Sequence, residues 1–205
     1  MSSEERLQRQ LDFLLEIDRL KQVERQTRIV GNHRRENTAE HSWHLALFAL
    51  VLGEWTDEPV DLLKVLTLCL VHDLVEIDAG DTFAYDQVAS VTKADREQLA
   101  AERLFGILPP DQGAELRSLW VEYEAMGTPE SRFANAVDRL QPVLLNHAAR
   151  SESPWVHHAL TRGQVLARNA PIASGSQVLW EVARRHIHDV HEQGLLLDDG
   201  PPPES

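Results

Sequence analysis

The stretch VDLLKVLTLCLVHDLVEID, residues 60–78, decides the fold class of this chain. Apolar side chains lie nearly all the way round a helix built from these residues, and such a helix belongs at the centre of a protein. Gly80 follows the stretch, and glycine readily adopts the conformation with positive φ that ends a helix. We therefore predict a buried central helix over residues 60–78.

The sequence on both sides of this stretch also has apolar residues at helical spacing, and no run of alternating β-branched residues indicates a strand. The further helices that we expect span about residues 4–23, 37–55, 90–106, 111–126, 129–150 and 176–193. Asn37 or Thr38 can cap the start of the second helix, with Glu40 in its first turn. Pro142 is expected to kink the helix over residues 129–150. The predicted fold class is therefore all-α.

Chain length and composition indicate one domain. A chain of 205 residues, 42% of them hydrophobic, can bury one sizeable core without a second domain. We assign residues 1–194 to this domain. We assign residues 195–205 to a flexible tail, because the chain ends in a proline-rich, acidic sequence.

Charge and cysteine content exclude several classes of protein. A net charge of −13 would repel a nucleic acid polymer. Cys69 is the single cysteine, so neither a disulfide framework nor a cysteine zinc site is expected. We find no secretory signal and no apolar run of membrane-spanning length, and we predict a cytoplasmic protein that binds no membrane. Positive charge gathers between Arg19 and Arg35, either as a solvated surface or as a place for a small anion.

His72 and Asp73 lie within the most apolar stretch of the chain and require an explanation. Burying an uncompensated carboxylate is costly. A histidine alone on an apolar face is usually a hydrogen-bonded core residue, and an aspartate alone is often a helix cap or half of an ion pair. Together the two residues offer one nitrogen and one oxygen ligand, and a divalent cation would compensate the carboxylate.

Two other helices offer further ligands. His41 lies in the first turn of the helix over residues 37–55, on the side that faces the core, and His44 lies one turn later at the edge of the same face. Spacing alone leaves the choice between His41 and His44 open. Asp138 borders the apolar stripe of the helix over residues 129–150, where it is either a ligand or half of a surface pair with Arg139.

A second His-Asp dipeptide, His188-Asp189, serves as a control. It lies in a terminal helix rich in charged residues, with few apolar neighbours, and we interpret it as a surface feature. The histidines at 147, 157 and 158 have no obvious partners in the sequence. We interpret them as surface or packing residues.

Several separated segments carry a resemblance to a known family. They are Arg25, RENTAEHS at residues 35–42, HDLVE at residues 72–76, Gly80-Asp81 and Asp138. In this order they resemble the HD-domain metal-dependent phosphohydrolases, specifically the 5′-deoxynucleotidase-like branch, over about residues 13–150. The resemblance implies a single-domain HD-type helical bundle. It also implies one divalent cation, which would be cobalt, manganese, iron or zinc, with the ligands His41, His72, Asp73 and Asp138.

The chemistry of phosphate ester hydrolysis suggests roles for the other residues. A bound metal lowers the pKa of water and screens the charge of the phosphoryl oxygens. Glu76 lies one helical turn after His72, so it can act as the acid or base; the alternative is an exposed helix residue. Arg25 resembles the family's phosphate-orienting arginine. The resemblance marks Asp81 as a second catalytic candidate, and it implies a substrate-binding set of Arg25, Gln26, Asp81, Thr82, Phe83 and Ala84.

These residues lead to a prediction of activity with two alternatives. The leading prediction is hydrolysis of (deoxy)nucleoside 5′-monophosphates to nucleoside and phosphate. Some relatives carry an aromatic residue where this chain has Gln26, so the preference for deoxyribose stays open. One alternative is hydrolysis of another small phosphoester. The other is a metal-binding regulatory protein or an oxidative HD protein.

The first helix bears on the oligomeric state. Its leucines form an apolar stripe that needs a packing partner, and the partner is either the protein's own core or a second copy in a homodimer.

Overall fold

The computed structural model describes residues 1–31 and 34–200, and it confirms the all-α fold class. The longer helices are α1 (Ser3–Ile17), α2 (Thr38–Leu52), α3 (Leu62–Val71), α6 (Lys93–Phe105), α7 (Pro110–Ala125), α8 (Pro129–Ala149), α10 (Arg162–Asn169) and α11 (Gln177–Glu192). The single-turn helices are α4 (Glu76–Ala79), α5 (Gln87–Ser90) and α9 (Pro154–His157). Two short strands, β1 (Glu24–Arg28) and β2 (Arg35–Asn37), pair with each other.

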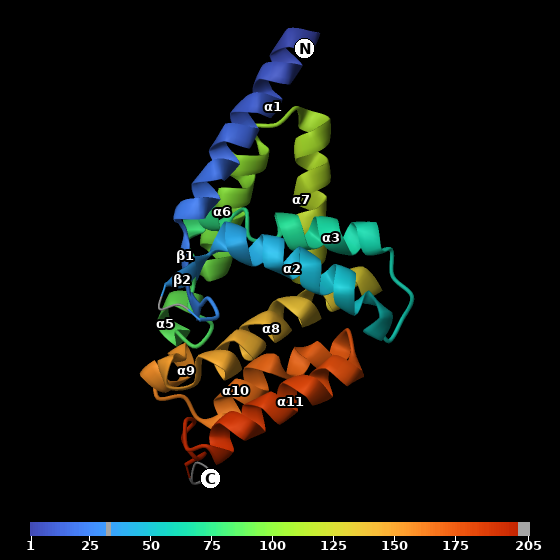
Figure 1. Ribbon diagram of the computed structural model, residues 1–205. Helices are drawn as coiled ribbons and strands as arrows, with labels where there is room; N and C mark the ends of the chain where they lie inside the picture. Colours follow the sequence, from blue (N-terminus) through green and yellow to red (C-terminus); the bar gives the residue numbers. More distant parts are fainter. Residues whose placement is uncertain (32–33, 201–205) are drawn as a thin grey trace.

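Helix α8 is the centre of the molecule. It packs against α2, α3, α7 and α11, and in Figure 1 it runs between the pair α2 and α3 above it and the pair α10 and α11 below it. Its buried face includes Phe133, Val137 and Leu140, which belong to the larger apolar cluster of the protein. Pro142 lies inside this helix. Asp138, in the middle of α8, therefore lies on a helix that packs against both α2 and α3.

The stretch that decides the fold class forms two helices, so the prediction of one helix over residues 60–78 is wrong in detail. Helix α3 ends at Val71, a turn follows, and α4 begins at Glu76. The α3 helix is also not buried all round, because Leu63 is 73% exposed and Leu70 is 51% exposed. Gly80 has φ of +73° and ends α4, as the sequence predicts.

Helix α2 begins as its capping residues predict. The Asn37 side chain accepts a hydrogen bond from the Glu40 N–H, and the Glu40 carboxylate accepts one from the Asn37 N–H. This reciprocal arrangement satisfies two backbone groups that a helix start leaves unpaired. It fixes the first turn of α2, in which His41 is fully buried.

The two strands and the helices α9 and α10 were not predicted. Strands β1 and β2 are rich in arginine and lack the apolar alternation that indicates a strand, yet they pair as an antiparallel ribbon between α1 and α2. Thr27 and Glu36 point inward from the ribbon and are buried. Helices α9 and α10 are too short to give a clear helical period in the sequence.

The apolar stripe of α1 is mostly outside the core. Phe13 is buried in a smaller apolar cluster that also includes residues of α6, and Leu20 in the following 3-10 helix joins it. The α1 leucines that the sequence placed on the packed stripe are exposed: Leu7, Leu11, Leu14 and Leu15. Core packing therefore does not account for these four leucines.

Residues 195–200 follow the helical domain and contact it. Leu196 is buried in the larger apolar cluster, and the Leu197 N–H donates to the Leu160 carbonyl. The sequence did not predict these contacts in the segment assigned to the tail. The rest of that segment, residues 201–205, lies outside the described residues. Among the residues described, no helix combines the length and the apolar composition needed to cross a membrane.

Candidate functional site

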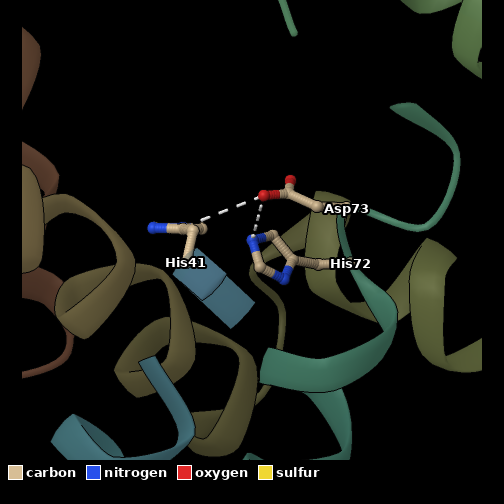
Figure 2. Close-up of side chains that lie close together, drawn as sticks. All are labelled: His41, His72 and Asp73. Carbon is tan, nitrogen blue, oxygen red and sulfur yellow. Dashed lines mark ion pairs between the residues drawn. The ribbon is translucent and has the colours of Figure 1, made fainter. Parts of the chain in front are cut away.

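Three distant segments bring their polar side chains together at one place. His41 comes from the first turn of α2, His72 and Asp73 come from the turn after α3, and Asp138 comes from the middle of α8. His72 and Asp73 lie in the turn between α3 and α4, and the Asp73 carboxylate lies above both rings in the view of Figure 2. In a continuous helix adjacent side chains would point about 100° apart.

The distances between the four side chains are short. The His72 Nε2 atom lies 3.1 Å from Asp73 Oδ2 and 3.8 Å from Asp138 Oδ1. The His41 Nε2 atom lies 2.9 Å from Asp138 Oδ1 and 3.8 Å from Asp73 Oδ2. The structure therefore places each carboxylate within 3.8 Å of both imidazole rings.

The orientation of His72 is set by the backbone of α3. Its Nδ1 lies 2.9 Å from the Cys69 carbonyl oxygen, which can only accept a hydrogen bond, so Nδ1 carries the proton. Its Nε2 is buried and lacks a hydrogen bond of acceptable geometry within the described part of the chain. A histidine that donates from one nitrogen and leaves the other without a hydrogen bond has the form of a metal ligand.

Carboxylates lie beside both nitrogens of His41, and the one at Nε2 is within hydrogen-bond distance. Nε2 donates to Asp138, while Nδ1 lies 3.6 Å from Glu36 Oε1. Glu36 is 2% exposed and accepts a hydrogen bond from Gln141. His44, the alternative ligand in the sequence, lies near Gln141 and packs edge-on against Phe48 instead. The structure therefore brings His41, and not His44, to the cluster.

Asp138 belongs to the cluster and does not pair with Arg139. Its Oδ2 accepts a hydrogen bond of 3.0 Å from the Tyr123 hydroxyl, and Arg139 instead donates to the Asn135 side chain. Burial disfavours the charged carboxylate, but the hydrogen bond from His41 and the nearby His72 ring outweigh burial and hold the pKa of Asp138 well below its ordinary value. The residue is therefore an anion ready to accept a cation.

The same balance applies to Asp73 and His72. Burial would raise the pKa of Asp73, but the positive charges of His72 and Arg25 lower it below its ordinary value. Burial would lower the pKa of His72, but the neighbouring Asp73 raises it well above its ordinary value. Protons and a metal ion therefore compete for the same nitrogen, and metal affinity should fall in acid.

The cluster fits a single divalent cation. Ligand atoms at about 2.1 Å from one cation lie roughly 3.0 to 3.4 Å apart in octahedral or tetrahedral geometry. The measured separations of 2.9 to 3.8 Å bracket this range. The ligand atoms of His41, His72 and Asp73 all lie within 4.8 Å of one another. Asp138 is not one of that group of three, but its Oδ1 lies 2.9 Å from His41 Nε2 and 3.8 Å from His72 Nε2.

Asp73 and Asp138 line an open pocket, whose volume is ≈ 830 Å³ when the solvent at its entrance is included. The predicted substrate-binding residues all line it: Arg25, Gln26, Asp81, Thr82, Phe83 and Ala84. The structure therefore brings this set to the same pocket as Asp73 and Asp138, although the residues come from two segments.

Glu76 also lines the pocket and is 5% exposed, which rules out the alternative of a surface residue. Its Oε2 accepts a hydrogen bond of 2.9 Å from the Thr38 hydroxyl. Burial, together with the charge of Asp73, raises the pKa of Glu76 well above its ordinary value. A carboxyl group whose pKa is raised in this way can exchange a proton with a bound molecule.

Arg25 links the cluster to the loop after α4. Its Nη1 donates to Asp73 Oδ2 at 3.0 Å and lies 3.8 Å from Asp81 Oδ1, and its Nε lies 3.4 Å from Glu36 Oε1. Burial raises the pKa of Asp81. The other arginines of the basic segment differ, since Arg34 forms a bidentate pair with Glu40 at the surface.

Sequence reasoning missed several polar residues of the site. Glu36 lies in the segment 35–42, but nothing in the sequence showed that it would be buried next to His41 and Arg25. Tyr123 was indistinguishable from an apolar core residue of α7 until its hydroxyl was seen on Asp138. The far wall of the pocket, which includes Asn146, Trp155 and Arg168, comes from regions with no recognisable motif.

The remaining histidines are partly as predicted. The structure corrects the interpretation that His147 has no partner, because its Nε2 lies 2.6 Å from Asp189 Oδ2. His158 packs its ring against Phe83 in the pocket wall, with ring centroids 4.3 Å apart. Neither joins a potential metal cluster within the described residues.

The fold and the cluster define an HD-domain protein. A model of the family described as HD domain matches residues 17–180, and the chain belongs to this family. It is 33% identical over 135 residues to 5′-deoxynucleotidase HDDC2 of Bos taurus and 31% identical over 135 residues to HDDC2 of Homo sapiens. These matches cover 65% of this chain, and 64% and 65% of the two relatives, respectively.

A solved structure is similar over nearly the whole chain. It is the predicted metal-dependent phosphohydrolase from Magnetospirillum magnetotacticum MS-1, which is 47% identical. The match covers 94% of this chain and 96% of that one, with a TM-score of 0.89. The arrangement of helices described above is therefore shared by a second protein of the family.

Proposed function

We propose that this protein is a metal-dependent phosphomonoesterase that hydrolyses (deoxy)nucleoside 5′-monophosphates to nucleoside and phosphate. The observation that carries the proposal is the convergence of two buried imidazoles on two carboxylates, Asp73 and Asp138, that line an open pocket. The names of the relatives agree with it, since they describe 5′-deoxynucleotidases and a metal-dependent phosphohydrolase. The names also favour a nucleotide over other phosphoesters.

His41, His72, Asp73 and Asp138 are the proposed ligands of one divalent cation. The buried Nε2 of His72, which has no hydrogen bond in the part of the chain described, supports this assignment. Such a cation supplies an acidified water and screens negative charge on phosphoryl oxygens. A set of two nitrogens and two oxygens suits several first-row ions, so cobalt, manganese, iron and zinc all deserve testing.

Glu76 is the proposed proton carrier. Its carboxylate lies in the pocket wall near Asp73, and its raised pKa lets it take a proton from water and return it to the leaving oxygen of the nucleoside. Thr38 fixes one carboxylate oxygen, so the other is the oxygen that faces a reacting group. Asp81 lies next to Arg25 and is the second candidate for proton transfer or for a contact with the sugar.

Arg25 is the proposed phosphate-binding residue. Its guanidinium is held by Asp73 beside the ligand cluster, and its fork of N–H donors matches a phosphate group. Gln26 and the loop residues Thr82, Phe83 and Ala84 extend the same wall and would contact sugar and base. Gln26 lacks the ring that an aromatic residue would place on the sugar, so the test must include ribonucleotides.

The experiment is a phosphate-release assay on a matched panel of 5′-ribonucleotides and 5′-deoxyribonucleotides. Metal-free protein is loaded separately with cobalt, manganese, iron or zinc, and bound metal is measured before each assay. We expect release from 5′-monophosphates with at least one metal and none after treatment with a chelator. Release from other small phosphoesters alone would support the alternative substrate class. No release with any metal would support a regulatory or oxidative protein.

The homodimer and the cytoplasmic location remain predictions. The exposed leucines of α1, together with Trp43 and Val51 on α2, leave apolar surface that a second copy would cover. Sedimentation velocity over a range of concentrations would measure the oligomeric state.

A further inference from the structure

The pocket has a second wall whose charges the proposed function does not use. Arg139 of α8 and Arg168 of α10 line this wall, opposite in sign to the acids of the metal-ligand cluster. Asn146 and Trp155 continue the wall toward α9. This part of the pocket is formed by the second half of the chain, whereas Arg25 and the loop over residues 81–84 come from the first half.

Arg139 and Arg168 have no carboxylate partner among residues 1–31 and 34–200. Arg139 donates from Nε to the Asn135 side chain at 2.7 Å and from Nη1 to the Arg168 carbonyl oxygen. Both acceptors are neutral. Arg168 is half-buried, and its guanidinium has neither an ion pair nor a hydrogen bond within those residues.

The other cations of the pocket differ. Arg25 is paired with Asp73, and Lys93 lies 3.4 Å from Glu97. The protein has 33 acidic residues and 20 basic ones, so a carboxylate partner is easily found for an arginine on most of its surface. Two arginines in contact without such a partner leave positive charge directed into the pocket, which an anion would neutralise.

We propose that Arg139 and Arg168 bind a second anionic group of the substrate, separate from the phosphate that is cleaved. The substrate class is then a phosphomonoester with two anionic groups, such as a nucleoside bisphosphate. The proposal rests on the proposed function for the cleavage step. The cleaved phosphate lies at the ligand cluster, where Arg25 already supplies a guanidinium, so the second pair of arginines serves another group.

Arg168 is the residue to change, because Arg139 also caps the carbonyl end of α10 and its loss would disturb that helix. The experiment compares deoxyadenosine 5′-monophosphate with deoxyadenosine 3′,5′-bisphosphate, with products separated by chromatography. For the unmodified protein we expect kcat/KM to be about tenfold higher for the bisphosphate, since a charged hydrogen bond has at least this effect. Arg168→Gln should raise only the KM of the bisphosphate, and Arg168→Lys should restore part of the preference.

Arg184→Gln is the matched control, because Arg184 lies on the surface of α11 and pairs with Glu181. It should leave the preference unchanged. The proposal is overturned if the unmodified protein shows no preference, or if Arg168→Gln raises the KM of both nucleotides by the same factor. The second result would mean that Arg168 contacts the cleaved phosphate or the base.

A binding measurement separates this proposal from the proposed function. Calorimetric titration of chelator-treated protein with the same two nucleotides requires no turnover. Tighter binding of the bisphosphate, lost in Arg168→Gln, supports the subsite even if neither nucleotide is hydrolysed. If both nucleotides are hydrolysed with equal affinity and equal KM, the proposed phosphatase function stands, and the proposed binding of a second anionic group by Arg168 is wrong.

Discussion

The chain contains the pattern His-Asp-x-x-Glu twice, at His72 and at His188, and the two copies have different structures. In the first copy, Asp73 and Glu76 both line the pocket, and the Asp73 side chain is 14% exposed. In the second copy the Asp189 side chain is 46% exposed and takes part in an ion pair with Arg150 at 3.0 Å. The residue types alone therefore do not define the site.

The path of the backbone is the first difference. Helix α3 ends at Val71, just before the first copy, and the turn that follows holds His72 and Asp73, with His72 Nε2 3.1 Å from Asp73 Oδ2. Helix α11 continues through the second copy to Glu192. Its adjacent side chains therefore point in different directions, and His188 and Asp189 do not face a common ion.

The neighbours are the second difference. Asp189 is neutralised by Arg150 and lies 2.6 Å from the His147 ring, so it needs no metal. Around Asp73, His41 and Asp138 arrive from two other helices and leave a buried nitrogen of His72 with no hydrogen bond in the described structure. A metal site thus requires ligands that are distant in sequence, and the following predictions test this contrast.

The largest effect is expected from Asp73→Asn, compared with the matched change Asp189→Asn. Asparagine removes the charge that balances a cation, so metal affinity should fall by at least about a hundredfold and phosphate release should fall to background. Asp189→Asn should leave both unchanged. Metal content of the purified proteins, measured by mass spectrometry, gives the answer. A full complement of metal in Asp73→Asn would remove this residue from the ligand set.

Glu76→Gln should give the next largest effect, with Glu192→Gln as the control at the same place in the second copy. Glutamine keeps the size of the side chain but cannot transfer a proton, so kcat should fall about 10²- to 10⁴-fold while bound metal is retained. Glu192→Gln should have no effect on kcat. Single-turnover kinetics with metal content measured in parallel tests both. Unchanged turnover in Glu76→Gln would leave Asp81 as the remaining acid.

Glu36→Gln should have a smaller effect that acts through His41. Glu36 Oε1 lies 3.6 Å from the His41 Nδ1 atom and 3.4 Å from the Arg25 Nε atom. Losing its charge should weaken metal binding about 10- to 100-fold, the usual range for a residue that orients a ligand. Competition with a chromogenic chelator measures this affinity. Equal affinity in the variant would mean that Asp138 alone positions His41.

The contrast also explains what the sequence could predict. The all-α class follows from helical spacing, and the start of α2 follows from Asn37 and Glu40, because both depend on residues that are near in sequence. The end of α3 at Val71 could not be predicted, since apolar residues continue through Val75 and only the packed structure selects the turn. The exposed leucines of α1 were misassigned because periodicity does not identify the partner surface.

Prediction of the site divides in the same way. The sequence identified four ligand candidates because the motifs that contain them occur in the order typical of the family. These candidates are His41, His72, Asp73 and Asp138, and the structure brings them together. Glu36, Tyr123 and the arginines of the far wall were not recognisable, because their roles depend on contacts between separate helices. The sequence could not distinguish His41 from His44 either, because both lie near the same face of α2 and only the folded structure shows which of them contacts Asp138.

The smallest effect that we expect is on folding stability, and it comes from the loss of the Asp189 charge in acid. Hydrogen bonds from His147 and then Arg150 lower the pKa of Asp189 to about 2, below the unfolded value of about 3.9. A lowered pKa stabilises the folded state above the unfolded pKa, and this stabilisation is lost as pH falls from about 4 to 2. Asp189→Asn should therefore be less stable than the unmodified protein at pH 7, with a difference that shrinks toward pH 3.

Urea unfolding followed by circular dichroism at several pH values measures this difference. Because Asp189 is at the surface, salt should reduce it further. A difference in the free energy of unfolding that stays constant from pH 7 to pH 3 would show that the carboxylate is not held by its charged neighbours. If the difference in the free energy of unfolding between the unmodified protein and Asp189→Asn were present only with bound metal, the second copy would also bind a cation. The contrast between the two copies would then disappear.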